Sequence, residues 1–220
     1  MLPTAPAMHR HPRNSLRAAI PLTNANAPEA PAGDASGSGN GQTPPEQPSG
    51  NGGDAPSGMP GGSGEVTQGT SANTIDTDTT ASGTTYTSTG DDENALRVDG
   101  AAVTLSGITV DKSAGKSSNT EDGDFYGMSA ALLATNGATV NLENAAVTSS
   151  AQNGNGVFSY GSGTTVNISD STITTTADNS GGIQTTGGAT TNASNLTVDT
   201  SGNSAAAIRS DRGGGTVLSN

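Results

Sequence analysis

A short pattern that returns about every 26 residues constrains the fold of this chain most strongly. Each copy has an apolar, a polar and an apolar residue, followed a few positions later by another apolar residue. The first position of each copy, which we call the anchor, is Val103, Val140, Val166, Thr191 and Val217 in turn, at intervals of 37, 26, 25 and 26 residues. Self-similarity at such a period is the sequence signature of a solenoid.

The content of each repeat indicates which solenoid it forms. Short strand-like segments alternate with Gly, Asn, Ser and Asp, and no repeat holds an amphipathic helical stripe. Leucine-rich and helical repeats are therefore disfavoured. Short strands stacked in parallel register bury a narrow column of Val, Ile and Leu. The sequence predicts an all-β fold, a right-handed parallel β-helix of about five to six turns over residues 65–220.

Composition agrees with this prediction. Only 30% of the residues are hydrophobic, Trp is absent and Phe and Tyr are scarce, which is thin for an ordinary globular core. A solenoid needs only one or two apolar side chains per strand. The chain has no cysteine, so disulfides and thiolate metal sites are excluded.

Residues 1–64 have a different composition. They contain all 11 prolines and many Gly and Ser, and such a segment buries too little apolar surface to offset its ordering entropy. We predict a disordered leader. Residues 17–22 resemble the apolar part of a signal peptide, but the run is short and contains Pro21. No stretch reaches the length of a transmembrane helix, so no membrane insertion is expected.

The charged residues exclude one class of partner and disfavour another class of function. The net charge is −12, and the solenoid region has few basic residues, so nucleic acid binding is not expected. Polysaccharide lyases and hydrolases share the parallel β-helix, but their sites need converging acids and bases. The predicted strands carry almost no ionisable side chains. We therefore predict no catalytic residues and keep an enzyme of that type as an alternative.

The longest interval places an insertion at residues 111–129, the best candidate for a binding site, because function in solenoids concentrates on loops that interrupt the stack. Carboxylates on this loop are suited to Ca²⁺, and its aromatic rings to a sugar. The predicted ligand-binding residues are Glu121, Asp122, Asp124, Phe125 and Tyr126. The alternative is a solvated polar loop whose aromatic pair covers the side of the β-helix.

A second acidic corner holds Asp91 and Asp92, next to Glu93. If the turns stack in register, this corner and the insertion emerge on related faces. The candidates for a shared Ca²⁺ site are then Asp91, Asp92, Glu121, Asp122 and Asp124. A solubilising turn is the alternative, and no other cofactor is expected.

Phe158 and Tyr160 form a second aromatic pair. Phe158 lies eight residues before its anchor, as do Leu132 and Ile183, so we expect it to stack with these side chains inside the column. Tyr160 then falls opposite Ala134 and Thr185, which leaves its orientation open.

Four segments resemble a known family, the large β-helical adhesin-like surface proteins of anaerobic gut bacteria related to Clostridia and Coriobacteria. The resemblance covers roughly residues 65–220 and rests on residues 90–98, 117–127, 153–163 and 206–215. It implies an extracellular or cell-surface β-helix that attaches to host or bacterial glycans or proteins. It brings no catalytic residues. Members of the family are longer, and this chain ends partway through a turn.

The sequence therefore predicts a non-catalytic surface protein for attachment or glycan binding. A Ca²⁺-dependent carbohydrate-binding module and a non-functional truncated fragment are the alternatives. No polar cap is visible at the last turn, which leaves end-to-end association through this uncapped turn as a further expectation.

Overall fold

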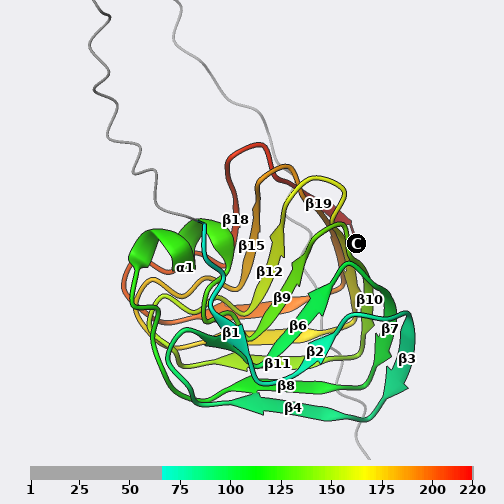
Figure 1. Ribbon diagram of the computed structural model, residues 1–220, viewed down its shortest axis with the longest axis horizontal. Helices are drawn as coiled ribbons and strands as arrows, with labels where there is room; N and C mark the ends of the chain where they lie inside the picture. The colour runs from blue at the N-terminus through cyan, green and yellow to red at the C-terminus, as the bar shows by residue number, and fades with distance from the viewer. Residues whose placement is uncertain (1–65, 220) are drawn as a thin grey trace, which may run out of the picture. The chain divides into compact units, whose positions relative to one another are not determined.

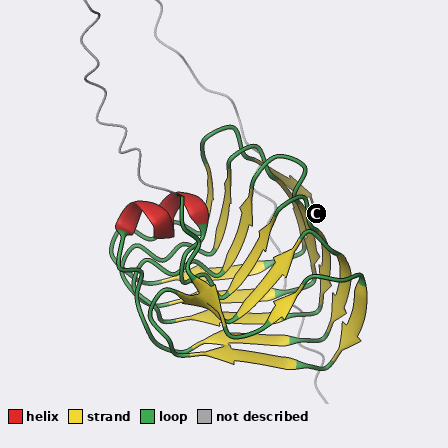
Figure 2. Ribbon diagram, viewed as in Figure 1, coloured by secondary structure: helices red, strands yellow, loops and turns green. Residues whose placement is uncertain are grey.

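A computed structural model describes residues 66–219, which form a parallel β-helix of about six stacked turns (Figures 1 and 2). The predicted fold is confirmed. The leader predicted over residues 1–64 lies outside the described residues. No helix in the described part of the chain is long and apolar enough to cross a membrane.

Each turn contributes up to three strands, and equivalent strands of successive turns form three parallel sheets. The first sheet contains β2 (Thr74–Ile75), β6 (Leu96–Asp99), β9 (Leu132–Thr135), β12 (Val157–Tyr160), β15 (Ile183–Thr186) and β18 (Ile208–Ser210). The second contains β3 (Thr79–Ser82), β7 (Ala102–Ser106), β10 (Thr139–Glu143), β13 (Thr165–Ser169), β16 (Thr190–Ser194) and β19 (Gly215–Ser219). The third contains β4 (Thr85–Ser88), β8 (Thr109–Lys112), β11 (Ala146–Ser149), β14 (Thr172–Thr175) and β17 (Thr197–Thr200).

Two further elements stand outside this regular pattern. A short parallel pair joins β1 (Thr70–Ser71) to β5 (Glu93–Asn94). A single helix, α1 (Thr120–Tyr126), lies in the connection from β8 to β9, within the predicted insertion. The insertion therefore carries a helix where the sequence predicts a loop.

The core is the column of inward side chains that the repeat predicts. Val103, Val140 and Val166 pair in register across β7, β10 and β13 and are buried. Alternate residues of a strand face opposite sides of the sheet, so the polar residue after each anchor faces out. One narrow hydrophobic cluster runs through the turns and includes residues of all three sheets.

The fourth anchor, Thr191, is a hydroxyl residue inside this column and is fully buried. Its Oγ1 lies 2.9 Å from Ser159 Oγ and 2.8 Å from Thr185 Oγ1, and Thr185 Oγ1 lies 3.0 Å from Thr216 Oγ1. Buried hydroxyls are tolerated when they pair with one another. A chain of hydroxyls thus replaces apolar contacts in the later turns.

The last anchor of the repeat is wrong by one residue. Thr216 pairs with Thr191, whereas Val217 pairs with Asn192 on the outer face and is 60% exposed. The turn between these two strands is one residue shorter than the spacing of the apolar residues suggests. Val217 is therefore a surface residue.

The predicted alignment of Phe158 is also wrong by one residue. Val157, not Phe158, pairs with Leu132 and Ile183, because the turn at residues 161–164 is one residue longer than its equivalents. Phe158 pairs with Leu133 and therefore faces away from the column. Ser159 takes the place opposite Ala134 and Thr185 that the sequence assigns to Tyr160, which instead pairs with Thr186.

Residues with positive φ make the corner between the second and third sheets. Asn144, Asp170 and Asn195 occupy equivalent places with φ of 53°, 51° and 48°. Asn and Asp tolerate this left-handed conformation better than other residues with a side chain. The recurrent Asn and Asp of the repeat therefore set where each strand ends.

Lys112 is the one fully buried cationic side chain among residues 66–219. Its Nζ donates a hydrogen bond to Ser88 Oγ at 3.2 Å and another to the Gly90 carbonyl. Burial lowers the pKa of Lys112, and the nearby carboxylate of Glu93 opposes that effect. Lys112 thus links the end of β8 to the acidic corner of the preceding turn.

The central place of Val166 in the column predicts a severe effect of charge. Val166→Asp buries an unpaired carboxylate between Val140 and Thr191, and we expect a loss of more than about 4 kcal/mol in the free energy of unfolding. Urea unfolding followed by circular dichroism measures this loss.

The matched control is Thr172→Asp, on the exposed outer face of β14, which we expect to change stability by less than about 1 kcal/mol. Equal effects of the two substitutions would contradict the inward placement of Val166.

Candidate functional site

The helix α1 forms at the centre of the predicted insertion because both of its ends are capped. The side chain of Asn119 accepts hydrogen bonds from the amides of Glu121 and Asp122, at 2.9 and 3.4 Å. Gly127 ends the helix with φ of 87°, a conformation that favours glycine. Glu121 and Asp122 in the first turn also interact favourably with the helix dipole.

α1 covers the outer face of the first sheet. Gln184 Nε2 and Thr186 Oγ1 on β15 donate hydrogen bonds to the carbonyls of Asp124 and Phe125, at 3.1 and 2.7 Å. A second, smaller hydrophobic cluster on this face contains the buried residues Ala130, Leu133 and Phe158, with Tyr160 packed against it. Phe158 is therefore buried, as predicted, but beneath the insertion and outside the column.

Three of the predicted ligand-binding residues contact one arginine of the last turn. The Arg212 guanidinium lies 3.7 Å from the centroid of the Phe125 ring and 2.9 Å from Glu121 Oε1. It also donates a hydrogen bond of 2.7 Å to the Tyr126 hydroxyl. The Tyr126 ring meets Tyr160 edge to face at a centroid distance of 5.6 Å. The exposed pair of aromatic rings thus joins the insertion to the last turn.

The two other predicted residues are partly buried carboxylates. Asp122 is 8% exposed, and burial raises its pKa, with repulsion from Glu121 adding to the effect. Burial also raises the pKa of Asp124, and the positive charge of Arg209 opposes that rise. Both groups therefore favour the protonated state more than a solvated aspartate does.

The structure brings the second acidic corner beside the insertion, on related faces as predicted. Asp91 Oδ1 accepts a hydrogen bond from the Lys116 amide at 3.1 Å, and Asp92 Oδ1 accepts one from the Ser118 amide at 2.6 Å. Each carboxylate thus binds a backbone amide of the insertion. Residues 66–219 contain no group of three or more His, Cys, Asp or Glu side chains placed to hold a metal ion together.

A groove lies on the outer face of the second sheet and is a better candidate for a binding site. It has a volume of about 400 Å³ and is lined by residues of five strands, β7, β10, β13, β16 and β19. At the usual strand spacing of about 4.8 Å, five strands span about 19 Å. The groove therefore crosses the strands and runs along the axis of the β-helix.

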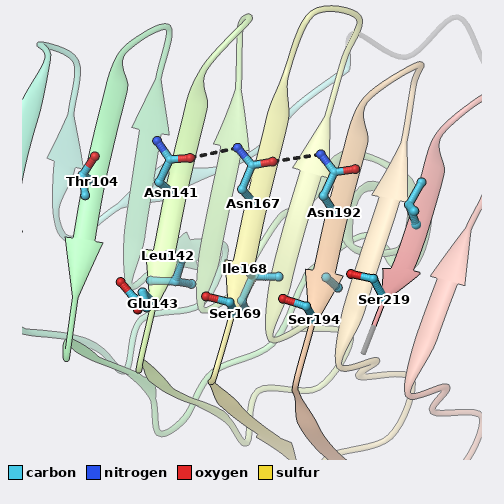
Figure 3. A pocket seen from close by; sticks show the side chains of 12 residues that line it. Thr104, Asn141, Leu142, Glu143, Asn167, Ile168, Ser169, Asn192, Ser194 and Ser219 are labelled. Carbon is cyan, nitrogen blue, oxygen red and sulfur yellow. Dashed lines mark hydrogen bonds between the residues drawn. The ribbon is translucent and has the colours of Figure 1, made fainter.

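Two rows of side chains border the groove (Figure 3). They stand two residues apart on the same strands, so about 6.6 Å separates them. One row, the Asn row, consists of Asn141, Asn167 and Asn192, with Thr104 before it and Val217 after it. The other row consists of Glu143, Ser169, Ser194 and Ser219.

The Asn row forms a ladder of side-chain hydrogen bonds. Asn192 Nδ2 donates to Asn167 Oδ1, and Asn167 Nδ2 donates to Asn141 Oδ1, both at 2.8 Å (Figure 3). Each carboxamide has two N–H groups and two lone pairs on oxygen, so the ladder uses only part of this capacity. The remaining donors and acceptors are repeated once per turn, where a polar ligand can reach them.

The chemistry of this groove is that of binding. Glu143 is its only ionisable side chain, and no nucleophile stands beside a base among its lining residues. Neutral carboxamides and hydroxyls border both sides. Such groups bind hydroxyl-rich ligands.

The sequence prediction missed the Asn row, although the signal is visible in the repeat. In three successive copies Asn follows the anchor directly, at Asn141, Asn167 and Asn192. Residues at the same position of stacked parallel turns lie side by side. A search for polar residues recurring one place after the anchor identifies the row.

Comparison with protein-family models, with curated proteins and with solved structures found no match.

Gly127 tests the packing of α1 on the first sheet. A Cβ at this position would lie 2.6 Å from Leu133 Cδ1 and 3.0 Å from the Phe158 ring. We expect Gly127→Ala to reduce the free energy of unfolding by about 2–4 kcal/mol, because left-handed strain and overpacking add. Chemical denaturation measures it.

Gly137→Ala is the matched control, since Gly137 has a similar φ of 80° and a Cβ at this position would have no other atom within 4 Å. We expect only the conformational cost of about 1–2 kcal/mol there. Equal losses for the two variants would contradict the packing of α1 on Phe158.

Asp122 predicts a pH-dependent contribution to stability. Its pKa is raised in the folded state, so the folded state binds the proton more tightly than the unfolded state does. The contribution of Asp122 is therefore most favourable at low pH and is lost as the pH rises through the pKa of the folded state. We expect Asp122→Asn to gain stability relative to the wild type as the pH rises from about 3 to about 7, on either side of an aspartate pKa, measured by urea unfolding at both values. An equal difference at both values would contradict it.

Proposed function

We propose that this protein binds an extended glycan chain along the groove of the second sheet and performs no chemistry on it. The observation that carries this proposal is the pair of neutral polar rows that crosses five strands (Figure 3). A groove of this width and direction suits a single unbranched chain lying along the axis of the β-helix.

The spacing of the groups supports a polymer with a regular repeat. The Asn ladder offers a carboxamide at every turn, about 4.8 Å from the next. One sugar ring of an extended β-linked chain has a similar length. Successive sugars therefore meet the same donors and acceptors at successive turns.

The biological setting we propose is attachment at a cell surface. The resemblance of the sequence to adhesin-like surface proteins supports this setting. Each contact between neutral polar groups is weak, with a net contribution of about 1 kcal/mol. Many copies displayed on one surface bind a polymer far more tightly than one copy does.

Asn167 stands at the centre of the ladder and provides the test. We expect Asn167→Ala to weaken glycan binding about tenfold or more, because it removes one carboxamide and breaks both ladder bonds. Calorimetry of the full chain with neutral β-linked oligosaccharides measures the affinity, and a thermal melt verifies that the variant is folded.

The matched control is Thr174→Ala on the outer face of the third sheet, which we expect to leave binding unchanged. Adding EDTA, or replacing Glu121 and Asp124 by Ala, also leaves binding unchanged if the groove is the site. Loss of binding in EDTA would support the Ca²⁺-dependent alternative. Failure of all neutral glycans to bind would overturn the proposal.

A further inference from the structure

The two ends of the Asn ladder differ from its middle. Both ladder bonds run in one direction, from the Nδ2 of one residue to the Oδ1 of the residue one turn earlier. Asn192 Oδ1 therefore accepts no hydrogen bond from residues 66–219, and Asn141 Nδ2 donates none to them. The groove thus has a free acceptor at its β16 end and free donors at its β10 end.

An apolar side chain adjoins the free acceptor. Val217 pairs with Asn192 in register and continues the Asn row into β19. It is 60% exposed, and it is one of three large hydrophobic residues that are exposed among residues 66–219. An apolar surface next to a carboxamide oxygen recognises a group that combines a methyl with an N–H donor.

We propose that the groove binds a glycan whose sugars carry N-acetyl groups, with one acetamido group seated between Asn192 and Val217. This inference rests on the proposed function. The acetamido N–H donates to Asn192 Oδ1, and the methyl group packs on Val217. The acetamido carbonyl of a sugar at the other end accepts from Asn141 Nδ2. Each contact continues the ladder by one amide.

The charge of the groove agrees with this ligand class. No Lys, Arg or His is among the groove-lining residues, and Glu143 supplies one negative charge. A glycan with carboxylate or sulfate groups finds no cation there and is repelled by Glu143. A neutral N-acetylated chain meets neither penalty.

The test compares matched oligomers by calorimetry with the full chain. The probes are β-1,4-linked oligomers of N-acetylglucosamine, glucose and glucosamine of equal length. We expect the acetylated oligomer to bind about tenfold or more tightly than the glucose oligomer, from one added hydrogen bond and one buried methyl group. Tighter binding of the glucosamine oligomer would overturn the inference in favour of an amine held by Glu143.

Variants of two neighbouring residues separate the contact from general effects. Val217→Thr should weaken binding of the acetylated oligomer about fourfold, the value of one buried methyl group, and leave the glucose oligomer unchanged. Leu218→Thr is the matched control, because Leu218 is 61% exposed on the same strand but does not line this groove. It should leave both affinities unchanged.

The outcomes distinguish this inference from the proposed function. Equal affinities for the acetylated and glucose oligomers, with no effect of Val217→Thr, would overturn the acetamido site and leave glycan binding in place. Absence of binding to any of the three oligomers would overturn both.

Discussion

Every feature of this protein depends on the in-register pairing of each strand with its equivalent in the next turn. Parallel pairing places identical repeat positions about 4.8 Å apart along the axis. Valines after one corner therefore stack on valines, and asparagines on asparagines. The same ladder that builds the core also arranges the outer surface, so a sequence repeat becomes a row of chemical groups.

This arrangement explains how so little apolar material supports an ordered fold. Each strand contributes one or two inward side chains to a narrow column, and where Thr191 replaces an apolar anchor its hydroxyl pairs with those of Ser159 and Thr185. The outer faces are free to vary. On the second sheet they form the polar groove, and on the first sheet they form the surface on which α1 packs.

The insertion stabilises the stack in a way that its sequence does not reveal. Its charged and aromatic side chains are well suited to a ligand when considered alone. In the folded protein Arg212, 91 residues after Glu121, contacts Glu121, Phe125 and Tyr126 together. Gln68 near the start of the described chain donates a hydrogen bond of 2.9 Å to the Tyr126 carbonyl. The helix therefore connects early and late turns across the first sheet.

The sequence by itself determined the parallel β-helix, the place of the insertion and the inward valines, because strand alternation and a repeat near 26 residues leave few other folds. It also indicated that the acidic corner at Asp91 and Asp92 lies beside the insertion. Only the tertiary structure decided the register of Phe158 and Val217, since single-residue changes in turn length reverse which face a side chain occupies. It also decided what the exposed groups contact. Asn141, Asn167 and Asn192 are far apart in the chain, and only stacking joins them into one surface.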